Sequence, residues 1–205
     1  MVNKKLQHFL AECDATMVVL LGRLSGDPEF SGISSKKPLD YANSLYRAVV
    51  SQQLSVKAAD TIYKRFVALL GDDLSPENVL GFSVEQLRSV GLSGQKASYV
   101  HAIALAAMDG SVDFETLDSL SDEEVINKLT DIKGIGLWSA EMFLIFTLGR
   151  ENVFSAGDAG LRRAIQINYP EAQLKTKEDY EAFAERWAPY KSYASLALWH
   201  SLDNK

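Results

Sequence analysis

Residues that commonly build metal or disulfide sites are scarce in this 205-residue sequence, which has one cysteine and three histidines. The lone Cys13 excludes an internal disulfide and cannot supply the four thiolates of an iron–sulfur or zinc site. The three histidines, His8, His101 and His200, lie outside every motif identified below, and we expect structural or solvated roles for them. Cysteine and histidine chemistry is therefore not expected here.

Long hydrophobic runs are also missing. Apolar runs such as Met17–Leu21 are far shorter than the roughly 20 apolar residues of a membrane-spanning helix. The first five residues carry charge but no apolar core of a signal peptide. We therefore expect no membrane association, and a location in the cytoplasm with the nucleoid of a bacterium or archaeon, or in the nucleus of a eukaryote.

Positive charge is in deficit, because 21 Lys and Arg residues face 27 Asp and Glu residues, for a net charge of −6. Proteins that bind DNA over a broad surface usually neutralise phosphates with clusters of Lys and Arg. Any DNA contact here should therefore be local, through backbone N–H groups and a few cations, for which the candidates are Lys96, Lys133, Arg162, Arg163 and Lys191.

The alternation of β-branched residues that marks strands is absent, whereas helical periodicity recurs along the chain. Local signals predict helix starts near Pro38, after Ser55, at Ser75–Pro76, after Thr176, and at capping boxes that begin with Ser83 and Ser121. We predict an all-α fold of two helical lobes with an active-site cleft between them. One lobe is formed mainly by about residues 38–110, and the other by about residues 111–205 with the N-terminal helices.

The most informative stretch is 129–163. Gly134 and Gly136 favour a tight hairpin at 129–141, followed by a helix that starts near Leu137. The first N–H groups of such a helix can hold a phosphate. Backbone carbonyls in the hairpin, those of Thr130, Ile132 and Ile135, could hold a monovalent cation, Na⁺ or K⁺. An ordinary glycine turn between two helices remains the alternative.

Two further features could act with the hairpin. Asp158 follows a glycine at the start of another predicted helix, where it could be an N-cap, a catalytic carboxylate or both. Gln52 and Gln53 form a polar corner between two helices that could enter a DNA groove, although a solvated turn would look the same.

Four segments in this order resemble the helix-hairpin-helix DNA glycosylases that carry a Gly/Pro-rich loop and an essential aspartate. They are Ser51–Ala59 (SQQLSVKAA), Ile132–Ala140 (IKGIGLWSA), Val153–Leu161 (VFSAGDAGL), and Arg186–Ala194 (RWAPYKSYA) with Trp199. The chain is most similar to the 3-methyladenine DNA glycosylase II branch, over roughly residues 38–202. An N-terminal β-rich domain found in larger bacterial members has no room before Pro38, so the resemblance is to a compact form.

The resemblance implies hydrolysis of the N-glycosidic bond of an alkylated base, of the 3-methyladenine or 7-methylguanine type, after base flipping in duplex DNA. Asp158 matches the catalytic aspartate. Related branches that also cut the strand have a lysine where this chain has Trp138, so a monofunctional hydrolase without lyase activity is expected. The implied place in the cell is base excision repair.

The resemblance also assigns binding residues. Trp138 and Trp199 match aromatic pocket walls, and Met142, Tyr193 and Tyr99 are candidates by proximity to motifs. The wedge that fills the gap left by the flipped base maps to Gln53 or Leu54. The other expected DNA contacts are Lys133, Gly134, Ile135, Gly136, Gln52, Ser55 and Arg163.

We expect no organic cofactor, and the chain is predicted to act as a monomer on double-stranded DNA. A non-catalytic helix-hairpin-helix module that binds damaged or bent DNA is the main alternative. A helical interaction protein with no DNA function is a third possibility, and it predicts no salt-dependent binding to duplex DNA.

Overall fold

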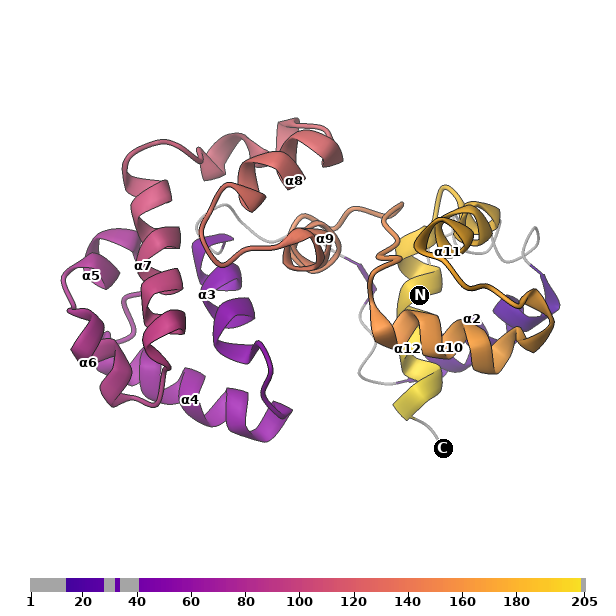
Figure 1. The fold of residues 1–205 in the computed structure, drawn as a ribbon, viewed down its shortest axis with the longest axis horizontal. Helices are drawn as coiled ribbons and strands as arrows, with labels where there is room; N and C mark the ends of the chain where they lie inside the picture. Colours follow the sequence, from indigo (N-terminus) through magenta and orange to yellow (C-terminus); the bar gives the residue numbers. More distant parts are fainter. Residues whose placement is uncertain (1–13, 28–31, 34–40, 204–205) are drawn as a thin grey trace. The chain divides into compact units, whose positions relative to one another are not determined.

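The computed structural model describes residues 14–27, 32–33 and 41–203. The expectations for Cys13, His8 and the helix start near Pro38 fall outside these residues. Within them every regular element is a helix, so the predicted all-α class is confirmed (Figure 1). None of the described helices is long and apolar enough to cross a membrane.

The chain divides into two compact units. One boundary lies between Phe143 and Leu144, and the N-terminal helix belongs to the same unit as the residues after this boundary. The first unit contains the hairpin and most of the N-terminal half, with elements α3 (Tyr41–Ser51), α4 (Val56–Leu69), α5 (Pro76–Leu80), α6 (Val84–Ser89), α7 (Gly94–Met108), η2 (Phe114–Ser119) and α8 (Asp122–Thr130). Helix α9 (Leu137–Phe146) starts in this unit and ends in the other.

Helix α7 organises the first unit, because α3, α5 and α6 all pack against it (Figure 1). Its buried positions include Val100, Ile103 and Ala104, whose small and branched side chains allow neighbouring helices to approach closely. Helix α4 packs against α3, which in turn packs against α7.

The second unit contains α2 (Ala15–Gly26), α10 (Ala159–Asn168), η3 (Pro170–Ala172), α11 (Lys177–Ala184), η4 (Glu185–Trp187) and α12 (Lys191–Asp203). Helix α12 packs against both α2 and α10 (Figure 1). Trp187, Tyr180 and Leu161 are among the fully or almost fully buried side chains of its core. This core supports the start of α10, where Asp158 lies.

Local capping signals are confirmed at the helix starts. Ser83 and Ser121 each form the expected capping box, and Pro76 occupies the first turn of α5. The Ser55 hydroxyl accepts a hydrogen bond from Ala58 N–H at 3.4 Å. Thr176 begins a third capping box.

The unit boundary differs from the sequence-based division, which separated the lobes near residue 110. The hairpin belongs with the preceding helices because Gln52 Nε2 donates to Gly134 O at 3.1 Å. The ring of Tyr99, on α7, also lies directly against Gly134. These two contacts join the hairpin to the corner after α3 and to α7.

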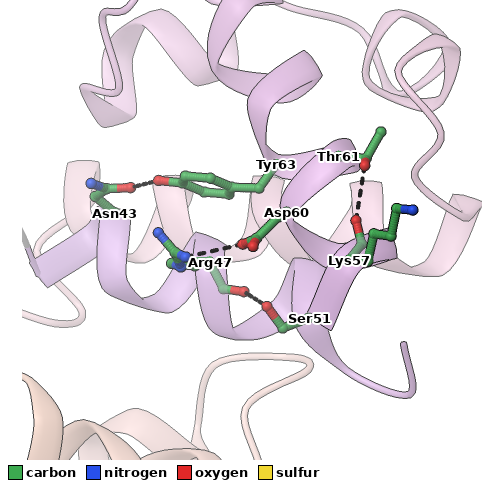
Figure 2. A network of polar contacts seen from close by, with 7 residues as sticks. All are labelled: Asn43, Arg47, Ser51, Lys57, Asp60, Thr61 and Tyr63. Carbon is green, nitrogen blue, oxygen red and sulfur yellow. Dashed lines mark hydrogen bonds and ion pairs between the residues drawn. The ribbon is translucent and has the colours of Figure 1, made fainter. Parts of the chain in front are cut away.

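A polar network fixes α3 against α4 and so holds the corner between them (Figure 2). Arg47 Nη2 donates to Asp60 Oδ1 at 3.1 Å, and the same guanidinium lies 5.2 Å from the centre of the Tyr63 ring. The Tyr63 hydroxyl donates to Asn43 Oδ1. Ser51 Oγ donates to Arg47 O at 2.8 Å, which closes the last turn of α3 beside the corner.

Candidate functional site

The hairpin uses its two glycines differently. Gly134 has φ of +98°, and a Cβ there would lie 2.2 Å from Tyr99 Cγ, so only glycine fits. A Cβ at Gly136 would have no neighbouring atom within 4 Å, and the φ of Gly136 is not in the left-handed region. The turn therefore requires glycine at 134 but not at 136, which leaves the Gly136 backbone open to an approaching ligand.

Backbone hydrogen bonds set the shape of the hairpin. Ile132 N–H donates to Leu129 O at 3.1 Å and Ile135 N–H donates to Ile132 O at 3.0 Å, while both isoleucine side chains are buried. Ala140 N–H donates to Gly136 O, four residues earlier. The N–H groups of the residues before Ala140 in α9 therefore precede the regular hydrogen bonds that run along the helix. The Lys133 side chain is exposed at the tip.

The predicted cation site uses the carbonyls of Thr130, Ile132 and Ile135. Ile132 O already accepts one hydrogen bond, from Ile135 N–H, and a carbonyl oxygen keeps a second lone pair. In the described part of the chain, no group of three or more His, Cys, Asp or Glu residues could hold a metal ion. A monovalent ion on the hairpin carbonyls stays a prediction.

The residues of the corner after α3 have different roles. Gln52 is half-buried and donates to the hairpin, whereas Gln53 and Leu54 are more exposed. Gln53 has φ of 57°, a left-handed conformation that is uncommon outside glycine. Both candidate wedge residues thus stand on the surface of the corner, with Ser55 committed to capping α4.

Lys96 also serves this corner. Its Nζ donates to Val50 O and to Gln52 O, each at 2.7 Å, at the C-terminal end of α3. Burial lowers the Lys96 pKa from its ordinary value. A cation on terminal helix carbonyls is favourable, so this side chain stabilises the corner.

Asp158 is the N-cap of α10, as expected. Its Oδ1 accepts from Leu161 N–H at 2.7 Å, and the same oxygen accepts from Trp199 Nε1–H at 3.0 Å. A Cβ at Gly160 would lie 3.0 Å from Asp158 Oδ1 and 3.3 Å from Trp199 Nε1. The carboxylate, the indole and Gly160 are therefore packed together at the start of the helix.

The loop that leads to Asp158 is held by the first turn of α12. The buried Ser192 Oγ donates to Arg150 O at 2.7 Å and accepts from Val153 N–H at 2.9 Å. Ser192 N–H donates to Glu151 O at 3.0 Å. These contacts fix the chain direction five residues before the carboxylate.

Tyr193 belongs to the same loop support. Its ring is buried, at 7% exposure, and its hydroxyl donates to Glu151 Oε1 at 3.4 Å. Burial and, to a smaller extent, the Glu151 carboxylate raise the Tyr193 pKa. A ring so deeply enclosed in its own unit has little surface to offer a ligand there, and its place as a pocket wall stays a prediction.

The other predicted pocket residues fall into two groups. Trp138, 47% exposed, and Met142 are four residues apart on α9 and so share one helix face in the hairpin's unit. Trp199 is in the unit of Asp158, half-buried, with its ring centre 5.9 Å from that of Phe146. The structure brings Trp199 to Asp158, and the grouping of all four residues in one pocket stays a prediction.

Three of the five cations expected to face DNA have partners within the protein. Lys96 binds carbonyls, Lys191 pairs with Glu185, and Arg162 Nε donates to Ala156 O at 2.6 Å. Lys133 and Arg163 have exposed side chains.

Tyr99 was a candidate pocket wall in the sequence analysis. Its ring lies against Gly134, and in this position it supports the hairpin.

Sequence reasoning did not single out Gly160 or Ser192. Gly160 had a signal, because it stands two residues after Asp158 in the motif-bearing segment, where a side chain could approach the capping carboxylate. Ser192 had none, since its partners are about 40 residues earlier in the chain.

Relatives of known name are similar to this chain over most of its length. DNA-3-methyladenine glycosylase 1 of Schizosaccharomyces pombe is 36% identical over 170 residues, which cover 82% of this chain and 73% of that protein. A Bacillus subtilis protein is 33% identical over 174 residues, and the chain spans 61% of its length.

Solved structures agree. A 3-methyladenine DNA glycosylase of Schizosaccharomyces pombe in complex with abasic DNA matches with a TM-score of 0.81 and 34% identity, covering 97% of each chain. A DNA-3-methyladenine glycosidase from Bacillus halodurans matches with a TM-score of 0.76 and 36% identity, covering 92% of this chain and 88% of that one.

The family model of the HhH-GPD superfamily base excision DNA repair proteins matches residues 46–189, a span that includes the corner, the hairpin and Asp158. This chain belongs to the HhH-GPD superfamily of base excision DNA repair proteins.

Proposed function

We propose that this protein is a monofunctional DNA glycosylase that removes alkylated bases, of the 3-methyladenine and 7-methylguanine type, from duplex DNA. The observation that carries the proposal is the placement of Asp158, oriented by two donors at the start of α10. Relatives named for 3-methyladenine support the substrate class. The target nucleotide is flipped out of the duplex before the bond is cut.

Asp158 supplies the chemistry. Cleavage of the N-glycosidic bond leaves positive charge on the sugar, which a nearby carboxylate stabilises. A carboxylate about 4 Å away, at an effective dielectric of about 20, contributes roughly 4 kcal/mol. That is on the order of a thousandfold in rate. The same carboxylate orients or deprotonates the attacking water.

A lyase step has no nucleophile at the expected position. The position two residues after Gly136, where strand-cutting relatives place a lysine, holds Trp138. An indole cannot form a Schiff base with the sugar, so the reaction ends with base release and an intact strand.

DNA binding relies on backbone groups more than on charge. The hairpin, with the open Gly136 and the exposed Lys133, holds a phosphate, aided by a monovalent cation on its carbonyls. Arg163 adds a second cation. Gln53 or Leu54 on the exposed corner fills the space of the flipped base. The protein acts as a monomer without an organic cofactor.

Cationic lesions suit this protein for a chemical reason. A methylated purine that carries positive charge leaves without a proton donor, whereas a neutral base needs a general acid. The electron-rich rings of Trp138 and Trp199 attract such a base, by about 0.5–2 kcal/mol for each well-placed contact.

The test is a base-release assay on methylated duplex DNA, with the products identified by mass. The wild-type protein should release 3-methyladenine and 7-methylguanine. Asp158→Asn should lower release by roughly a thousandfold or more while binding to duplex DNA persists, because asparagine keeps the N-cap.

Two results contradict the proposal. Release by Asp158→Asn at the wild-type rate would remove the catalytic role of this residue. Salt-dependent DNA binding without any base release by the wild-type protein would favour a non-catalytic module that recognises damaged or bent DNA.

A further inference from the structure

We infer that Trp199 is a positioning residue for Asp158, acting through its indole N–H, in addition to any stacking of its ring on a base. This inference rests on the proposed function, because it assigns the carboxylate a fixed orientation for the reaction. It concerns residues of one compact unit only.

Two donors converge on one oxygen of the carboxylate. Leu161 N–H and Trp199 Nε1–H both donate to Asp158 Oδ1, at 2.7 and 3.0 Å. An N-cap aspartate needs only the first of these bonds. Because both bonds end on the same atom, the carboxylate cannot rotate about its Cβ–Cγ bond without breaking both.

The indole is itself held in place. The Phe146 ring lies 5.9 Å from the Trp199 ring, at an interplanar angle of 30°, and Trp199 packs against the unit's hydrophobic core. A Cβ at Gly160 would approach Trp199 Cδ1 and Nε1 to 3.3 Å and Asp158 Oδ1 to 3.0 Å. Glycine at this position therefore lets the indole and the carboxylate meet.

An indole suits this task better than a cationic side chain. Its N–H donates but never ionises, so it orients the carboxylate without neutralising its negative charge. The reaction needs that charge close to the sugar, and small displacements of a reacting group cost large factors in rate. Trp199 thus acts through Asp158.

The experiment compares single-turnover release of 7-methylguanine from duplex DNA by the full-length wild-type protein, Trp199→Phe and Trp187→Phe. Phenylalanine keeps an aromatic ring but has no N–H. We expect Trp199→Phe to lower the rate at saturating protein roughly tenfold to a hundredfold, the range for a hydrogen bond to a charged group. The protein concentration for half-maximal rate should stay within about twofold.

Trp187→Phe is the matched control. Trp187 is fully buried in the same unit, and its Nε1 has no hydrogen-bond partner among the described residues. Losing this N–H should leave the release rate of the folded protein unchanged, provided that both variants are measured well below their unfolding temperatures.

A second route to the same contact is Gly160→Ala. The added methyl group requires its neighbours to move by a few tenths of an ångström, which separates the indole from the carboxylate. Gly160→Ala should also lower the base-release rate, with little change in the protein concentration for half-maximal rate. It tests the contact independently if Trp199→Phe fails to fold.

The double variant Asp158→Asn with Trp199→Phe separates positioning from stacking. If the indole acts through the carboxylate, the second substitution adds no further loss. A wild-type rate for Trp199→Phe, a change in half-saturation alone, or additive losses in the double variant would each overturn the inference. Absence of release from the wild-type protein would instead overturn the proposed function, and this inference with it.

Discussion

The turn of the hairpin, at residues 133–136, and the loop before Asp158 both lead the chain into a helix, but they are held by different means. The hairpin depends on backbone hydrogen bonds, on one side-chain hydrogen bond from Gln52 and on one missing side chain, at Gly134. The Asp158 site depends on side chains, with Ser192 behind the loop and Trp199 on the carboxylate.

The difference follows from what each site must offer. A phosphate can be held by backbone N–H groups, which nearly every residue provides, so phosphate binding at the hairpin depends less on particular side chains. A reaction needs one charge at one place, which requires a chain of side-chain contacts. Substitutions should therefore affect stability and binding at the hairpin, and rate at Asp158.

The largest effect on stability is expected for Gly134→Ala. The new Cβ would overlap the Tyr99 ring in a left-handed conformation, so the free energy of unfolding should fall by about 3 kcal/mol or more. Chemical denaturation measures this directly. A loss under about 1 kcal/mol would show that the hairpin can move away from α7 at little cost.

Gly136→Ala is the matched comparison. Because the Cβ added at residue 136 would have no neighbouring atom within 4 Å, the free energy of unfolding should change by less than about 1 kcal/mol. If a phosphate approaches this backbone, the affinity for duplex DNA should fall by roughly tenfold at low salt. Unchanged affinity, measured by titration with labelled duplex, would place the phosphate elsewhere.

Lys96→Met should have an intermediate effect on stability. It removes charge-assisted bonds to Val50 O and Gln52 O, and we expect a loss of about 1–2 kcal/mol in the free energy of unfolding. The salt dependence of DNA binding should not change. Lys133→Met is the control with the opposite pattern, in which stability is kept and the salt slope falls by about 0.9.

The helix starts were predictable because their signals are local. The capping boxes at Ser83 and Ser121 and the N-cap at Asp158 each join residues three positions apart. Such contacts form within one turn, so residue type and spacing determine them. The all-α class follows from the same local patterns.

The contacts that assemble the sites could not be predicted in this way. Trp199 is 41 residues from Asp158, and Gln52 is 82 residues from Gly134. Periodicity places each residue on a helix, but the packing of several helices decides which side chains meet. For the same reason Lys96 was expected to face DNA, whereas it binds the end of α3.

The smallest effect is expected for Tyr193→Phe, which tests whether its hydroxyl matters to the loop before Asp158. The bond to Glu151 is long, at 3.4 Å, so its loss should change the free energy of unfolding near neutral pH by at most about 0.5 kcal/mol. The base-release rate should be unchanged, because Ser192 continues to hold the loop.

The pH dependence of the free energy of unfolding gives a second measurement of the Tyr193 phenol. Since burial raises the Tyr193 pKa, the folded state favours the neutral phenol, whose stabilising effect is present below the ordinary pKa of 10.0. It is lost as the pH rises through the raised pKa of the folded state. The stability of Tyr193→Phe relative to the wild-type protein should therefore increase above pH 10, as followed by denaturation at several alkaline pH values. If the difference between the two proteins stays constant with pH, the phenol is not enclosed in solution, and the ring is available to a ligand after all.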